Sequence, residues 1–223
     1  MSGERGGMQM ETVLIIAAVV GVFVIAVIFA VRSNNKRASM IEDFARKRGG
    51  SYSRTDTQGL SKKIDAFFPD ETFRLDNIVT VETGNRTVIF FDSEYHYRER
   101  RRGGSFATGC LIESNRFRTA GASMEIVARN WVNAATVADQ VELGSAAFSR
   151  DYIVVSKDRV SASKTLTAAL QEVLAAHRQS PLFNPVRIGL GANGAVLLTG
   201  LNAEPERWQD LVDLARKIEA SLP

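Results

Sequence analysis

The sequence has very little cysteine, histidine or proline. Among its 223 residues there are one cysteine, Cys110, two histidines and five prolines. A single cysteine excludes an intrachain disulfide, and zinc sites usually need several cysteines and histidines at regular spacing. The sequence also lacks a G-x-S-x-G nucleophile motif, so neither a hydrolase triad nor a structural zinc domain is indicated. No cofactor is predicted.

The excess of positive charge is small and confined to two short segments. The net charge is +3. Residues 32–48 hold six Lys/Arg against Glu42 and Asp43, and Arg98 to Arg102 reads RERRR. A nucleic-acid-binding domain more often spreads Lys/Arg over a whole face, so no nucleic-acid partner is expected. The candidates for contact with anionic lipid headgroups or a partner protein are Arg32, Lys36, Arg37, Arg98, Arg100, Arg101 and Arg102.

One long run without charge stands near the N-terminus. Residues Thr12 to Val31 read TVLIIAAVVGVFVIAVIFAV. A helix of twenty residues is about 30 Å long, which matches the hydrocarbon thickness of a bilayer. The stretch predicts an uncleaved transmembrane helix rather than a signal peptide, because no positive leader and no A-x-A cleavage site flank it. The lipid bilayer is therefore an expected partner.

The charges flanking this run predict its orientation. One arginine precedes it, whereas Arg32, Lys36 and Arg37 follow at once. The positive-inside rule places the short N-terminus outside the cell membrane and residues 32–223 in the cytoplasm. A pilin-like alternative remains, in which the chain is cut after Gly6 and the domain lies outside the cytoplasm. The short leader ERGGMQMETVLII supports this alternative, and the charge distribution opposes it.

The sequence after the span predicts a helix and then a single soluble domain. We expect a tail at 1–11, the span at 12–31, a basic juxtamembrane helix at 32–50 and a soluble domain at 51–223. Within KRASMIEDFARKR (36–48), Met40, Ile41, Phe44 and Ala45 share a face, and Gly49-Gly50 supply a stop. This helix either lies against lipid headgroups or extends the span as a stalk that docks on the domain. The narrow apolar face favours the stalk.

The soluble part alternates short strands and helices in an order typical of an α+β fold. We expect one mainly antiparallel sheet with helices packed on one face. The predicted strands are 73–81, 86–97, 107–113, 123–129, 152–156 and two within 185–200. The predicted helices are 60–68, 161–177 and 204–222. Pro205 suits the first turn of the last helix.

Asp92, Glu94 and His96 are the best-placed residues for metal chemistry. They alternate along TVIFFDSEYHY (87–97) and therefore share one face of the expected strand. Same-face neighbours lie about 7 Å apart, so three ligands on one straight strand do not easily converge on one ion. A strand whose face turns polar toward its end is the favoured interpretation. Cys110 is expected to be a small buried residue, and His177 a charged group at a helix C-terminus.

The stretch GLGANG, Gly189 to Gly194, fits the G-x-G-x-x-G pattern of dinucleotide-binding loops. That loop must follow a strand and open a helix, whose N-terminus receives the pyrophosphate. Here AVLLTG follows, which reads as a second strand. Asn193-Gly194 is instead typical of the centre of a type I′ hairpin turn. We therefore predict a β-hairpin and no nucleotide site.

Several short segments resemble a family of uncharacterised bacterial single-span membrane proteins with a soluble α+β domain. They are GLSKKIDAFF (59–68), DNI (76–78), VIFFDSEY (88–95), FSRDYIV (148–154) and the closing β-β-α. The resemblance implies no activity and supplies no functional residues. The favoured hypothesis is a membrane-anchored, non-catalytic domain that binds a partner or stabilises a membrane complex. A membrane-surface enzyme of unknown reaction is the alternative from a different class.

Overall fold

The computed structural model describes residues 4–69, 71–97, 105–120, 123–129, 139–178, 186–200 and 203–223. Contacts between Cα atoms divide the chain into two units, residues 1–40 and 41–223. The first unit is helical throughout its described part, and the second contains the sheet.

A single helix, α1, runs from Glu4 to Lys47. The predicted span and most of the predicted juxtamembrane helix are therefore parts of one helix. It ends at the predicted glycine stop: Gly49 has a φ of 65° and its N–H donates to Arg46, while the N–H of Gly50 donates to Ala45. This pair of bonds is the Schellman arrangement, which satisfies the last carbonyl groups of a helix.

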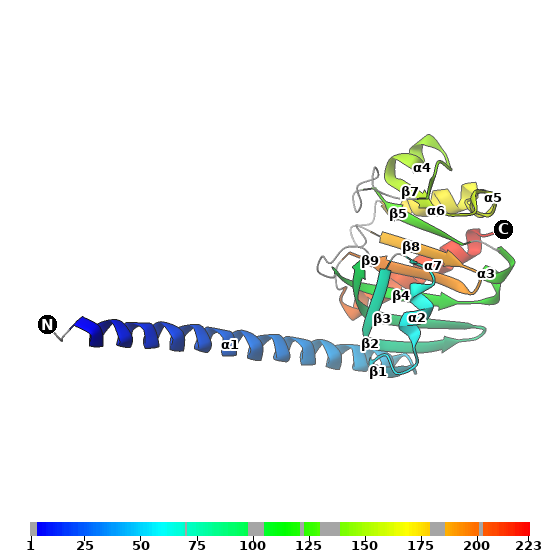
Figure 1. Cartoon of the computed structure of the whole chain (residues 1–223). Helices are drawn as coiled ribbons and strands as arrows, with labels where there is room; N and C mark the ends of the chain where they lie inside the picture. The colour runs from blue at the N-terminus through cyan, green and yellow to red at the C-terminus, as the bar shows by residue number, and fades with distance from the viewer. Residues whose placement is uncertain are drawn as a thin grey trace. The chain divides into compact units, whose positions relative to one another are not determined.

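The described part of residues 41–223 forms a nine-stranded antiparallel sheet with helices (Figure 1), in order β1-β2-β3-β4-β9-β8-β5-β7-β6. The antiparallel α+β prediction is thus confirmed. The strands are β1 (Ser51–Thr55), β2 (Glu71–Thr83), β3 (Arg86–Tyr97), β4 (Ser105–Glu113), β5 (Met124–Ala128), β6 (Gln140–Val141), β7 (Tyr152–Val155), β8 (Val186–Gly191) and β9 (Gly194–Thr199). The remaining helices are α2 (Leu60–Asp65), α3 (Asn115–Ala120), α4 (Ala146–Asp151), α5 (Arg159–Thr165), α6 (Ala168–Arg178), the 3-10 turn η2 (Pro205–Arg207) and α7 (Trp208–Ser221).

The larger core lies between one face of the sheet and most of the helices. Alternate residues of β3 and β9, such as Phe90 and Leu197, meet the apolar stripe of α7 there. Trp208 of α7 is fully buried and stacks on Phe90 with ring centroids 5.1 Å apart. The apolar residues of α7 recur with the helical period of 3.6 residues, and the face that they form is the buried one.

The opposite face of the sheet carries a second, smaller core under α2. Leu60, Ile64 and Phe68 pack there on Phe91 of β3 and Val196 of β9. Figure 1 shows α2 in front of the strands and α7 behind them. Most of the described helices thus pack on one face of the sheet, as predicted, and α2 covers the other face.

The predicted helix 161–177 proves to be two helices. α5 ends at Thr165 and α6 begins at Ala168. The Thr167 hydroxyl accepts a hydrogen bond from the N–H of Leu170 at 3.1 Å, which caps α6 and favours a new helix start over continuation. Leu166, Leu170 and Leu174 are buried in the core.

GLGANG forms a hairpin, as predicted, but with a different turn. Gly191 pairs with Gly194, so Ala192 and Asn193 are the central residues rather than Asn193 and Gly194. Neither central residue has a positive φ, so the turn is not type I′. The prediction of the turn type was wrong because the strands continue through both flanking glycines.

Candidate membrane anchor and domain surface

The apolar part of α1 has the composition of a membrane span. Its large side chains from Ile16 to Val31 are exposed, from 45% for Val27 to 71% for Phe29. Val19–Lys47 contains a window of mean hydropathy 1.5, which is long and apolar enough to cross a membrane. Exposed apolar side chains around a whole helix need a partner, and a bilayer is the simplest one.

The predicted basic contact residues follow this stretch. Arg32 and Lys36 are exposed on α1, and Arg37 is half-buried. Contact of these residues with lipid headgroups stays a prediction, based on the way Lys and Arg behave at the ends of spans. Arg98, Arg100, Arg101 and Arg102 lie outside the described residues.

The last turns of α1 belong to the core of the sheet-containing unit. Ile41 and Ala45 are buried there. The ring of Phe44 meets Phe90 and Trp208 edge-on, with centroids 5.5 and 5.3 Å away. These contacts are those of a helix docked on its domain, as the stalk interpretation requires.

Asp92, Glu94 and His96 share one face of β3 but do not form a common site. Asp92 accepts hydrogen bonds from Asn77 Nδ2 at 3.0 Å and from Thr108 Oγ1 at 3.2 Å. Glu94 lies 3.6 Å from His96 Nε2 and 4.0 Å from Arg74. Within the described residues no group of three His, Cys, Asp or Glu side chains is arranged to hold a metal ion.

Asp92 is the centre of a hydrogen-bond chain that crosses four strands. Tyr52 Oη donates to Asn77 Oδ1 at 2.9 Å, and the N–H of Ala203 donates to Thr108 Oγ1 at 2.8 Å. Asn77 has a φ of 51° at a bulge in β2, which directs its amide to both neighbours. The DNI segment therefore has a structural role: it joins β1 to the segment before α7.

A buried charge cluster lies on the α2 side of the sheet, and the sequence did not predict it. Arg187 of β8 forms ion pairs with Glu71 and Glu125, with its Nε 2.7 Å from Glu125 Oε1. The guanidinium carbon lies 4.8 Å above the centre of the Phe68 ring. The two carboxylates raise the pKa of Arg187 against the opposing effect of burial, so the cation is firmly held.

The glycines of GLGANG make room for this second core. A β-carbon on Gly189 would stand 2.8 Å from Phe67 Cβ, and one on Gly191 would stand 2.8 Å from Phe67 Cε1. A β-carbon on Gly194 would lie 2.2 Å from the carbonyl oxygen of Ile112. The three glycines are thus explained by close packing of side chains and backbone.

The other candidate reactive groups are structural. Burial raises the pKa of the Cys110 thiol to about 12, so it stays protonated. Burial, together with the charge of Lys217, lowers the pKa of His177 to about 4. His177 is therefore neutral at pH 7, and its predicted role as a charged helix cap was wrong. The sequence could not show that this part of α6 is half-buried beside Lys217.

The strand β1 forms one edge of the described sheet and borders a small cavity. The cavity is about 90 Å³ and lies on the α2 side. Its lining includes the hydroxyl residues Ser51, Ser53 and Thr55 and the apolar residues Ile78 and Ile89. Sequence reasoning missed this strand because five residues, SYSRT, carry no apolar alternation.

Comparisons with known proteins give one structural likeness and no relative in sequence. No protein-family description matches the chain, and no characterised protein matches it by sequence. The crystal structure of the mycobacterial trehalose monomycolate transport factor A, TtfA, is similar with a TM-score of 0.56. The match covers 83% of this chain and 96% of that chain at 15% identity. The likeness at this identity is one of fold.

Proposed function

We propose that this protein is a single-span membrane protein whose soluble unit binds a protein partner without catalysis and so stabilises a membrane complex. The observation that carries the proposal is α1. It combines an exposed apolar stretch with final turns in which Ile41, Phe44 and Ala45 pack into the core of the sheet-containing unit. A helix built in this way serves as an anchor for the domain.

The arrangement of the ionisable groups favours binding over catalysis. The buried charged groups of the described ion pairs have structural partners: Arg187 pairs with Glu71 and Glu125, and Glu219 pairs with Arg86 at 2.8 Å. Asp92 is held in its own hydrogen-bond chain. Catalytic groups need a perturbed pKa in a cleft that a substrate can enter. These paired groups are instead bonded to one another and enclosed by packed side chains.

The fold likeness to TtfA points in the same direction. That protein is named as a transport factor for trehalose monomycolate. A part in transport is compatible with the non-catalytic binding that we propose for this chain. The likeness is confined to the fold, so the cargo and partners of TtfA are not assigned to this chain.

We further propose that the N-terminus lies outside the cell membrane and that residues 32–223 lie in the cytoplasm. The charge difference across the span supports this orientation. Because Cys110 is fully buried, a cysteine introduced at exposed Thr57 becomes the reporter for a membrane-impermeant maleimide. Thr57→Cys should be protected in intact cells and labelled in inverted vesicles. The opposite pattern, or an intact mass showing cleavage after Gly6, would favour the pilin-like alternative.

Partner binding is tested by purifying the full chain from membranes in mild detergent. We expect a second membrane protein to co-purify at fixed stoichiometry, measured by native mass spectrometry. Its abundance in membranes should fall when the chain is deleted and recover when the chain is restored. A chain that purifies alone, or a partner whose abundance is unchanged, would contradict the proposed function.

A further inference from the structure

We propose that the free edge of β1 accepts an extended acidic segment of the partner protein as an added strand. This inference rests on the proposed function and assigns it a surface and a partner chemistry. Three features of β1 carry it: an open row of backbone groups, a surplus of positive charge and the adjacent cavity.

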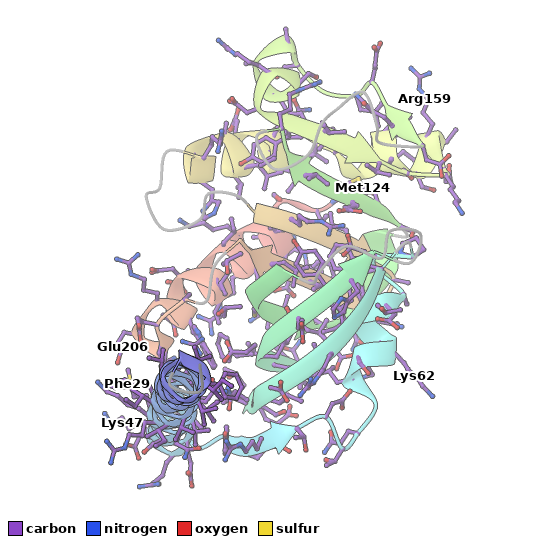
Figure 2. The ribbon with its side chains drawn as sticks, turned by 60° about the vertical axis from the view of Figure 1, so that its left-hand side comes forward. Phe29, Lys47, Lys62, Met124, Arg159 and Glu206 are labelled. Carbon is purple, nitrogen blue, oxygen red and sulfur yellow. The ribbon has the colours of Figure 1, made fainter. Side chains whose placement is uncertain are left out.

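The backbone of β1 is paired on one side. Its register with β2 runs from Ser51 opposite Thr80 to Thr55 opposite Asp76. No described strand pairs with its other side, and Figures 1 and 2 both draw β1 at the lower border of the sheet-containing unit. An edge of this kind presents N–H and C=O groups to an incoming strand.

The opposite end of the sheet is less suited to this role. There β6 comprises Gln140–Val141 alone, and a strand of two residues offers too few groups for pairing. β1 has five residues, which suffices for a short added strand. The difference in length favours β1 as the edge that binds.

The charge around β1 determines what can bind. Residues 46–63 include six Lys/Arg and one acidic residue, Asp56. Two of the six are paired with acidic residues outside this range, Arg46 with Glu42 and Asp43 and Lys63 with Glu113, so the surplus comes from the other four. Arg54 and Lys62 are exposed, and Figure 2 shows Lys47 and Lys62 on either side of β1. The Asp56 carboxylate is engaged by the N–H groups of Leu60 and Ser61 at 2.9 and 2.7 Å. A second copy of β1 would bring like charges together, whereas an acidic strand complements them.

The cavity adds a place for a side chain. Its lining combines hydroxyl residues of β1 with the apolar side chains of Leu60, Ile78 and Ile89. Side chains of an added strand alternate between the faces of the sheet, so one of them would lie on this side. An added strand that alternates aliphatic and acidic residues would place an aliphatic side chain against the apolar lining and acidic side chains near the basic residues.

The test uses the full chain in nanodiscs of uncharged phosphatidylcholine. The probe is a fluorescent peptide, about eight residues long, of alternating valine and glutamate with blocked ends. We expect it to bind, measured by anisotropy, and to protect β1 amides against hydrogen exchange. The valine–lysine peptide and a valine–glutamate peptide with N-methylated backbone should not bind.

Charge reversal locates the site. R54E with K62E should weaken binding of the acidic peptide about tenfold or more. The matched control is K157E with R159E, which makes the same charge change on exposed residues near β7, away from β1. Thermal unfolding confirms that each variant is folded. If the β1 variant does not fold, the site is tested by whether the peptide protects the β1 amides of the wild-type chain against hydrogen exchange.

Three outcomes would overturn the inference: no peptide binding, equal binding to both reversed variants, or protection elsewhere than β1. Protection of β1 by phosphatidylglycerol nanodiscs without peptide binding would assign the basic edge to lipid and also overturn it. If the β1 variant retains its co-purifying partner, the inference fails while the proposed function stands. If the wild-type chain has no partner, the proposed function itself fails.

Discussion

The ring of Phe67 occupies the space that a side chain on Gly191 would need. A β-carbon there would stand 2.8 Å from Phe67 Cε1, closer than such atoms approach in proteins. The glycine therefore belongs to the packing of the turn after α2 on the hairpin β8–β9. The contact explains a glycine of the G-x-G-x-x-G pattern by packing rather than by phosphate binding. The packing explanation can be tested by measuring the stability of variants.

Gly191→Ala should destabilise the protein by about 1–3 kcal/mol, since the ring must move to admit a methyl group. In a Phe67→Ala background the same change should cost much less, because the contacting atom is at the far end of the ring. Urea unfolding of the four chains gives the coupling energy. Equal costs in both backgrounds would show that the ring is not the constraint. A change in nucleotide binding with unchanged stability would restore the phosphate-loop interpretation.

Arg187→Met should cost about 3–5 kcal/mol, the usual result of leaving buried carboxylates without their cation. Glu71 is 2% exposed and cannot regain solvent without local unfolding. Arg74→Met is the matched control, because the Arg74 side chain is 72% exposed beside its acidic neighbours and should cost below about 1 kcal/mol. Chemical denaturation measures both. Similar values for the two variants would contradict the structural role of the buried cluster.

Cys110 should resist thiol reagents while the protein is folded. The thiol is fully buried and burial raises its pKa to about 12, so almost no thiolate is present at pH 8. Mass spectrometry should show no maleimide adduct in the native chain and one adduct per chain in urea. Rapid modification of native protein would show that β4 opens readily. Thr57→Cys, at an exposed position, provides the positive control.

Acid should weaken the fold in a range set by His177. Its pKa in the folded protein is lowered to about 4, whereas an unfolded chain titrates near 6.5. The unfolded state then binds the extra proton first, so the free energy of unfolding falls as the pH decreases from about 6.5 to 4. Because the side chain is only partly buried, we expect about 1–2 kcal/mol over this range. His177→Gln should flatten the slope, and an unchanged slope would assign it to other groups.

The strands and helices with strong periodicity were predictable from sequence. β3 spans Arg86–Tyr97, the predicted range, because alternation is continuous there. The short elements α3, α4 and β6 were not predicted, since two to six residues carry too little pattern. α5 and α6 were merged because the break depends on one hydroxyl, that of Thr167.

The ion-pair and hydrogen-bond clusters could be recognised only from the folded structure. Arg187 meets Glu71 across 116 positions and Glu125 across 62. No local spacing relates these residues, so they were not foreseen as a group. Asp92 was foreseen on the correct face of β3, but its partners come from a bulge in β2 and from β4.

The position of β9 in the middle of the sheet bears on how the chain acquires its structure. β9 pairs with β4, and Thr199 bonds to Thr108 across 91 positions. Contacts between distant residues form slowly, because the intervening chain must be ordered before they can stabilise the fold. On the ribosome β1 to β4 emerge long before β9 does, and α1 emerges before all of them. The apolar helix is therefore accessible while the sheet is still unfinished, so the membrane insertion that we propose would precede completion of the sheet.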